Sequence, residues 1–257
     1  MDCEKLLGVA TDIAYDLLES GAEIYRVEES IQRIFAAYGA REGSIFAIPT
    51  LLILSLEDEE GNPHTAIRRL GNHGSDLARV GAYNDLCRSI CRDRPPLEEI
   101  PAALARIGRT PHYTPLQQIF AGGCVAFAFT LLFGGGINDA LCALVCGMGV
   151  KWIQHLFEKL EANAFFTTIV ASFAAAAGAL ILAQAGLLSN LDKAVIGILM
   201  NLVPGLALTN VMRDIIAGDL VAGLTKLVEA LLTATGIALG TGVALSVWQA
   251  LMGGMPV

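Results

Sequence analysis

Charged residues are scarce in this chain, and they are unevenly distributed. Only 16% of the 257 positions are charged, the net charge is −8, and no run is rich in Lys or Arg. A phosphate backbone requires a basic surface, so nucleic acid is not an expected partner. Residues 1–118 hold 30 charged side chains, whereas residues 119–257 hold 12. The first part therefore has the charge density of a soluble domain, and the second is too apolar for a soluble core.

The motifs of several enzyme classes are also missing. The sequence has no HExxH pattern, no P-loop, no GxSxG elbow and no CxxC pair. We therefore expect no catalytic residue, no metal and no cofactor. The acidic first residues are not followed by a short apolar segment with a cleavage site, so no secretory signal is expected.

Residues 1–112 are predicted to form a small α+β domain. Apolar residues recur at helical spacing in four segments. These segments are 6–17, 24–38, 75–91 and 97–107. Between the helices, 44–56 and 64–70 have the composition of strands and are separated by an acidic turn that contains glycine. This pattern predicts a small antiparallel sheet.

Two local assignments in this domain bear on function. Ser20 and Glu23 have the S-x-x-E spacing of a capping box, in which each side chain bonds the other's backbone N–H. His73, Ser75 and Asp76 are the residue types of a hydrolytic triad. Adjacency in sequence does not establish that geometry, and Ser75 is more simply the N-cap of the following helix. A membrane-tethered hydrolase-like enzyme, or a sensor, acting through this domain is the alternative to transport.

Residues 116–257 are predicted to form an α-helical multi-pass membrane domain. A spanning helix needs about 20 apolar residues. Five segments meet or approach this length: 119–137, 139–157, 165–188, 194–209 and 227–252. Small residues crowd the third and fifth segments, where they allow close helix packing. The expected fold class is thus five transmembrane helices preceded by a small α+β cytosolic domain.

Basic residues near the ends of these segments predict the orientation. One side carries Arg106, Arg109, Lys151, Lys159, Arg213 and Lys226, and the other carries Lys193. By the positive-inside rule, the N-terminal domain is cytosolic. With five spans, the C-terminus then lies outside.

The fourth segment contains a proline inside its apolar run. Pro204 has no N–H and clashes with the preceding turn, so it frees the carbonyl of Met200 at a depth where lipid offers no donor. The half-helix that begins near Gly205 then presents the positive end of its dipole, which suits an anionic substrate. A simple kink, in which Asn201 makes an interhelical hydrogen bond, is the alternative interpretation.

Glu229 is the one acid in the fifth segment. An intramembrane acid is a functional candidate by default, here as a proton or substrate relay. Lys226 precedes it by three residues, so an ion pair at the membrane edge is the alternative.

Two stretches of the sequence resemble the threonine/serine exporter family. The first is LESGAEIYRVE at 18–28, and the second is LVPG at 202–205, followed by LTN, RD and GD up to residue 219. The resemblance implies a secondary exporter of small carboxylate-bearing metabolites in the bacterial inner membrane, with threonine, serine or a C4 dicarboxylate such as succinate as substrate. It also implies a split, two-component form, in which this chain is the larger subunit and acts with a second small membrane protein.

The resemblance and the residue pattern meet at the fourth segment. We expect the substrate to be bound by Asn201, Pro204, Gly205, Thr209, Asn210, Arg213 and Asp214. Gly205 and nearby N–H groups are expected to receive the carboxylate, Arg213 to guide it, and Glu229 to carry the coupling proton.

The expected partners follow from the same reasoning. Tyr25, Arg26 and Glu28 are not needed for capping and are assigned to a partner or regulatory surface. The expected partners are the second membrane subunit, the carboxylate substrate and membrane lipid. A homo-oligomer is left open.

Overall fold

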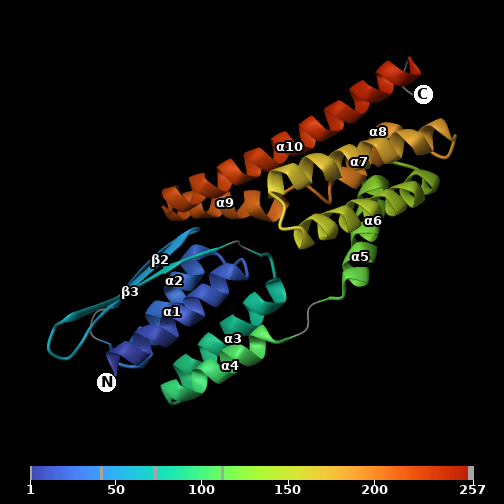
Figure 1. Ribbon diagram of the computed structural model, residues 1–257. Coiled ribbons are helices and arrows are strands. Elements are labelled where there is room, and N and C mark those ends of the chain that lie inside the picture. Colours follow the sequence, from blue (N-terminus) through green and yellow to red (C-terminus); the bar gives the residue numbers. More distant parts are fainter. Residues whose placement is uncertain (1, 41–42, 72–73, 111–112, 254–257) are drawn as a thin grey trace. The chain divides into compact units, whose positions relative to one another are not determined.

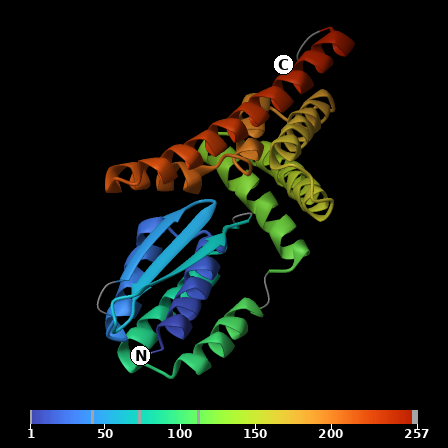
Figure 2. The ribbon, with the colours of Figure 1, turned by 60° about the vertical axis from the view of Figure 1, so that its left-hand side comes forward.

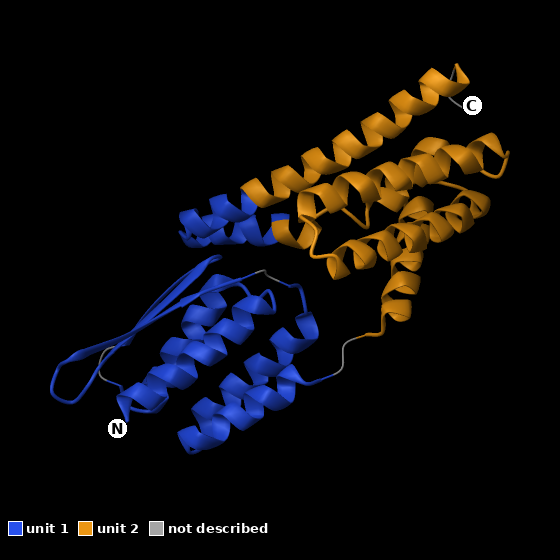
Figure 3. Cartoon of the chain, in the orientation of Figure 1, with its two compact units in different colours: residues 1–111, 208–227 blue, residues 112–207, 228–257 orange. Residues whose placement is uncertain are grey.

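The computed structural model is mostly helical (Figures 1 and 2). The structure describes residues 2–40, 43–71, 74–110 and 113–253. The chain divides into two compact units (Figure 3). Unit 1 comprises residues 1–111 and 208–227, and unit 2 comprises residues 112–207 and 228–257. Unit 1 therefore joins two stretches that lie far apart in the sequence.

Unit 1 begins with two helices, α1 (Cys3–Glu19) and α2 (Ile24–Ala37), at the places that the apolar spacing predicts. Gly21 connects them with a φ of 92°. A Cβ at this position would lie 2.6 Å from the carbonyl oxygen of Gly74. Both the left-handed conformation and the close backbone approach require glycine here.

A small antiparallel sheet follows, as predicted, but it has three strands, because the predicted segment 44–56 turns at Pro49 and Thr50 and forms two of them. It consists of β1 (Gly43–Ile48), β2 (Leu51–Glu57) and β3 (Pro63–Arg69) in the order β1-β2-β3. In the central strand, Leu52, Leu54 and Leu56 are fully buried and alternate with partly exposed neighbours. One face of the sheet therefore packs against α1 and α2, which lie together beside the strands (Figure 2).

The rest of the N-terminal segment of unit 1 is helical. It contains α3 (Leu77–Asp93), the 3₁₀ turn η1 (Leu97–Glu99) and α4 (Ile100–Gly108). Ser75 is not the N-cap of α3, so that prediction is wrong. The cap is Asp76, whose carboxylate accepts a hydrogen bond from the Arg79 N–H at 3.0 Å. Aspartate and serine are both good cap residues, and here the aspartate lies at the boundary.

Residues 208–227 complete unit 1 as a helical hairpin. The second half of α9 (Gly205–Ala217) and the start of α10 (Leu220–Met252) lie side by side (Figures 1 and 2). Gly218 turns the chain between them with a φ of 99°. A Cβ at Gly223 would lie 2.6 Å from Cγ1 of Ile215, so the two helices are in direct contact. Ala222 joins the buried core of unit 1.

Four helices of the described chain are long and apolar enough to cross a membrane. They are α5 (Pro115–Leu132), α6 (Ile137–Lys159), α7 (Ala164–Gln184) and α10. They correspond to the first, second, third and fifth predicted segments. The predicted fourth segment, 194–209, is not one helix. It contains the end of α8 (Leu191–Leu199) and the start of α9, which are separated by residues 200–204.

Small residues let the helices of unit 2 approach closely. A Cβ at Gly147 on α6 would lie 2.6 Å from the Cβ of Ala126 on α5. On α10, Gly240 lies directly against Ser172 of α7, and the Ser172 hydroxyl donates to the Gly236 carbonyl at 3.3 Å. The packing role predicted for small residues of the third and fifth segments is confirmed at Ser172, Gly236 and Gly240.

Candidate functional site

The helix break predicted at Pro204 is present. The last turn of α8 tightens, because the N–H groups of Asn201 and Leu202 bond carbonyls three residues back, at 3.2 and 2.8 Å. Helical geometry resumes only at Gly205. Pro204 cannot donate to the preceding turn, and its ring disfavours helical geometry in the residue before it. Residues 200–204 are therefore irregular backbone between two helices.

Asn201 is half-buried and serves as a connector between helices. Its side-chain amide donates to the Gly122 carbonyl of α5 at 3.0 Å and to the Ile198 carbonyl at 3.3 Å. This is the interhelical hydrogen bond that the kink interpretation predicted. The Gly205 N–H, expected to receive a carboxylate, donates to the Val203 carbonyl at 2.9 Å.

Arg213 forms an ion pair with a residue 190 positions earlier in the chain. Its guanidinium donates to the Glu23 carboxylate, which is only 14% exposed. The same carboxylate also pairs with Arg26, at 2.7 Å. Glu23 therefore holds two guanidinium groups within unit 1, one from α2 and one from α9. The two sequence stretches that carry the family resemblance meet at this carboxylate.

This arrangement replaces the predicted capping box. Ser20 ends α1 instead of starting α2, and its hydroxyl donates to the Asp16 carbonyl at 2.7 Å. Glu23 is the N-cap of α2, but its side chain makes no capping hydrogen bond. A serine side chain near a helix end can bond back to the carbonyl four residues earlier instead of forward to an N–H, and Ser20 does so as the C-cap of α1.

A second ion pair lies inside the hairpin of α9 and α10. The Asp214 side chain is fully buried, and its carboxylate accepts from the Lys226 ammonium at 2.8 Å. Lys226 therefore pairs with Asp214 rather than with Glu229, so the alternative interpretation, an ion pair between Lys226 and Glu229, is wrong. Glu229 itself is exposed on α10. Asp214 and Lys226 thus come into contact across the Gly218 turn, although their spacing in the sequence did not predict it.

Two other residues of the predicted set lie on α9, Thr209 and Asn210. Thr209 is exposed and Asn210 is half-buried. Asn201, Pro204 and Gly205 belong to unit 2, whereas Thr209, Asn210, Arg213 and Asp214 belong to unit 1. The predicted substrate-binding set is thus divided between the two units.

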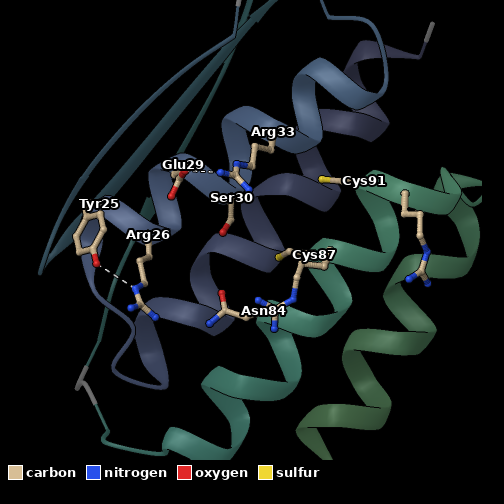
Figure 4. A pocket seen from close by; sticks show the side chains of 10 residues that line it. Tyr25, Arg26, Glu29, Ser30, Arg33, Asn84, Cys87 and Cys91 are labelled. Carbon is tan, nitrogen blue, oxygen red and sulfur yellow. Dashed lines mark hydrogen bonds and ion pairs between the residues drawn. The ribbon is translucent and has the colours of Figure 1, made fainter.

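The predicted partner or regulatory surface lies on α2. The Tyr25 hydroxyl accepts from Nε of Arg26 at 3.0 Å. Glu28 accepts from the Ala47 N–H of β1 at 3.0 Å, and burial, reinforced by the nearby Asp219 carboxylate, raises its pKa. Tyr25 and Arg26 also line a groove between α2 and α3 (Figure 4).

The hydrolytic set gains no support from the described residues. Asp76 is occupied as a helix cap and pairs with Arg79 at 3.6 Å, and His73 lies outside the described residues. Over the described ranges, no group of three or more His, Cys, Asp or Glu side chains could hold a metal ion.

The main residue that sequence reasoning assigned to the wrong role is Glu23. Its partner Arg213 is too distant in sequence for any periodicity to reveal. One feature of the sequence pointed to this contact: Glu23 and Arg213 each lie in one of the two stretches that resemble the exporter family.

The chain is similar to known proteins over nearly its whole length. A family model described as "Putative threonine/serine exporter" matches residues 9–248. A "Probable threonine/serine exporter" of Mycobacterium tuberculosis is 23% identical over 241 residues, which is 92% of this chain and 45% of that protein. "Uncharacterized protein C7D4.12c" of Schizosaccharomyces pombe is 30% identical over 143 residues, 54% of this chain and 18% of that protein.

No solved structure matches the chain. The chain spans less than half the length of the two curated relatives. The family match nevertheless covers both units, including the Glu23 stretch and the α8–α9 break. The chain belongs to the threonine/serine exporter family.

Proposed function

We propose that this chain is a subunit of a secondary exporter of small carboxylate-bearing metabolites: threonine and serine, or a C4 dicarboxylate such as succinate. The family match over residues 9–248 carries this proposal. Four apolar helices of spanning length support a multi-pass location, which we assign to the bacterial inner membrane. A transporter, rather than a hydrolase or sensor, is the function proposed.

The proposed carboxylate site is the irregular backbone between α8 and α9. Non-helical backbone at membrane depth is tolerated only inside protein or beside a water-filled cavity. Because the Gly205 N–H already donates to Val203, we assign the carboxylate to the next N–H groups of the first turn of α9, those of Leu206 and Ala207. First-turn N–H groups have no intrahelical carbonyl partner, and the helix dipole favours an anion there.

Arg213 has a more specific proposed role than a guide for substrate. Its guanidinium is 46% exposed and is held by Glu23, so an arriving carboxylate competes with a carboxylate that is already bound. Substrate binding at Arg213 would release the contact between α9 and the start of α2. The Glu23–Arg213 pair is thus proposed as a switch within unit 1.

We propose five membrane crossings, with α8 and the first turn of α9 as a broken fourth span. The N-terminus is then cytosolic and the C-terminus outside. Glu229, exposed on α10, is proposed to carry the coupling proton. A C-terminal tag in intact spheroplasts should be cleaved by an added protease, and protection of the tag would contradict the five-span topology.

The proposal also includes a second, smaller membrane protein. We propose that a second membrane protein of the same family acts together with this chain.

Efflux from preloaded cells tests this function. Labelled threonine, serine and succinate should leave faster when this chain and the partner are expressed together than when either is expressed alone. Glu229→Gln should lower efflux, while Glu158→Gln, which removes an exposed acid from α6, should not.

The enzyme alternative makes the opposite prediction. If Pro204→Ala and Arg213→Ala leave every flux unchanged while His73→Ala or Ser75→Ala abolishes the cellular effect, a hydrolase-like function should replace the exporter.

A further inference from the structure

A basic groove lies between α2 and α3 in a protein that is acidic overall. The groove has a volume of about 710 Å³, in the range of small-molecule sites. Four arginines line it, against one acid, Glu29. The arginines are Arg26, Arg33, Arg88 and Arg92. The whole chain has a net charge of −8, so this concentration of guanidinium groups is local.

The two walls contribute equally to this charge. Arg26 and Arg33 are seven residues apart on α2, about 10 Å along the axis, and Arg88 and Arg92 are four apart on α3, about 6 Å. Ser30 and Asn84 also line the groove, one from each wall (Figure 4). Positive charge therefore extends along a channel rather than meeting at one point. A single phosphate or a four-carbon dicarboxylate would engage only part of it.

Three of the four guanidinium groups pair with a carboxylate on their own helix, and the fourth, that of Arg26, pairs with the half-buried Glu23 at the start of α2. Arg33 pairs with Glu29 at 2.6 Å, Arg92 with Asp93 at 2.8 Å, and Arg88 with Asp85. In each of these three pairs both side chains are exposed, and exposed ion pairs contribute little binding energy in water. A phosphate, which accepts bidentate hydrogen bonds from arginine, can replace such a partner.

The groove does not have the chemistry of a covalent site. Burial raises the pKa of the Cys87 thiol to about 12, and burial also raises the pKa of Cys91. Both thiols therefore stay protonated at neutral pH and are poor nucleophiles. Ionic recognition is what this set of side chains offers.

We propose that the groove between α2 and α3 binds a soluble small molecule of nucleotide size that carries two or more phosphate groups. This binding is independent of the proposed transport, so either can fail without the other.

ATP is the probe, titrated into the full chain purified in neutral detergent. We expect saturable binding that is at least tenfold tighter for ATP or pyrophosphate than for inorganic phosphate or succinate. Arg33→Gln/Arg88→Gln, which removes one guanidinium from each wall, should weaken ATP binding about a hundredfold, because each charge-assisted hydrogen bond contributes about tenfold. Arg69→Gln/Arg106→Gln removes two exposed arginines that do not line the groove and should change the affinity less than threefold.

Circular dichroism and size-exclusion chromatography establish that both double variants fold. Absence of ATP binding at millimolar concentration would overturn the proposal, as would equal weakening in the two variants. Nanodiscs address a lipid phosphate as the alternative source. If phosphatidylglycerol, but not phosphatidylcholine, blocks ATP binding to the parent chain, and the Arg33→Gln/Arg88→Gln variant retains less bound phosphatidylglycerol than the parent chain does, the occupant is a lipid headgroup and the soluble ligand is excluded.

Discussion

Neutralising Asp214 should destabilise unit 1 far more than neutralising an exposed aspartate. The Asp214 side chain is 0% exposed and lies 2.8 Å from the ammonium of Lys226, which is 19% exposed. Asp214→Asn keeps the shape and removes the charge, which leaves a mostly buried ammonium without its counter-ion. Breaking a buried pair in this way costs about 3 kcal/mol. For a chain of this size, that corresponds to a fall of about 6 to 12 °C in thermal midpoint.

Differential scanning fluorimetry of the detergent-purified chain measures this shift. Asp85→Asn is the matched control, because it breaks an exposed ion pair with Arg88. The Asp85 side chain is 74% exposed and the Arg88 side chain 72%. An exposed pair contributes little, so the control should move the midpoint by less than about 2 °C. Equal shifts for Asp214→Asn and Asp85→Asn would refute the burial argument.

The double variant Asp214→Leu/Lys226→Met separates the pair from its surroundings. One oxygen of Asp214, Oδ1, is buried and makes no hydrogen bond with the described residues. Dehydration of that oxygen offsets part of the attraction to Lys226. We therefore expect the free energy of unfolding of the double variant to lie within about 1 kcal/mol of that of the parent chain. A double variant less stable than Asp214→Asn would show that the charges stabilise the hairpin on their own.

Two other perturbations test the packing and the ionisation. Gly147→Ala should destabilise unit 2 by about 1–3 kcal/mol, because its Cβ would lie 2.6 Å from that of Ala126. In the same thermal assay Gly149→Ala, whose Cβ would enter open space, should be neutral or slightly stabilising, because alanine favours a helix more than glycine does. Equal effects of the two substitutions would contradict the packing. Burial raises the Glu28 pKa above 4.5, so stability falls as pH rises through the folded pKa. Glu28→Gln should therefore be more stable than the parent at pH 7 and equal to it below pH 4.5; a pH-independent difference would contradict this.

Local patterns were sufficient to predict most of the secondary structure. Apolar spacing at the helical period placed α1 and α2, because one buried face imposes a period on the sequence. Strand-like composition on both sides of an acidic turn that contains glycine placed the sheet. Pro204 predicted the break because the loss of an N–H is a property of the residue itself. These features depend on neighbours within a few positions.

Contacts between distant residues could not be predicted in the same way. Lys226 had an acid three residues away at Glu229, yet it pairs with Asp214 across the Gly218 turn. Glu23 had a sufficient local explanation as a cap, yet it binds Arg213. In both cases the tertiary partner outweighed the local one, since exposed short-range pairs contribute little and a buried charge requires a partner.

Flux through proteoliposomes tests the central claim most directly. The chain and the proposed partner are reconstituted together, and the release of labelled threonine and succinate is compared with that of threoninol, which lacks the carboxylate. We predict saturable release of the carboxylates, little release of threoninol, and at least a tenfold loss of carboxylate flux in Pro204→Ala, with Pro101→Ala on α4 as the control. Flux no greater than that of empty liposomes, or equal release of threoninol, would contradict a carboxylate exporter that works through the break between α8 and α9.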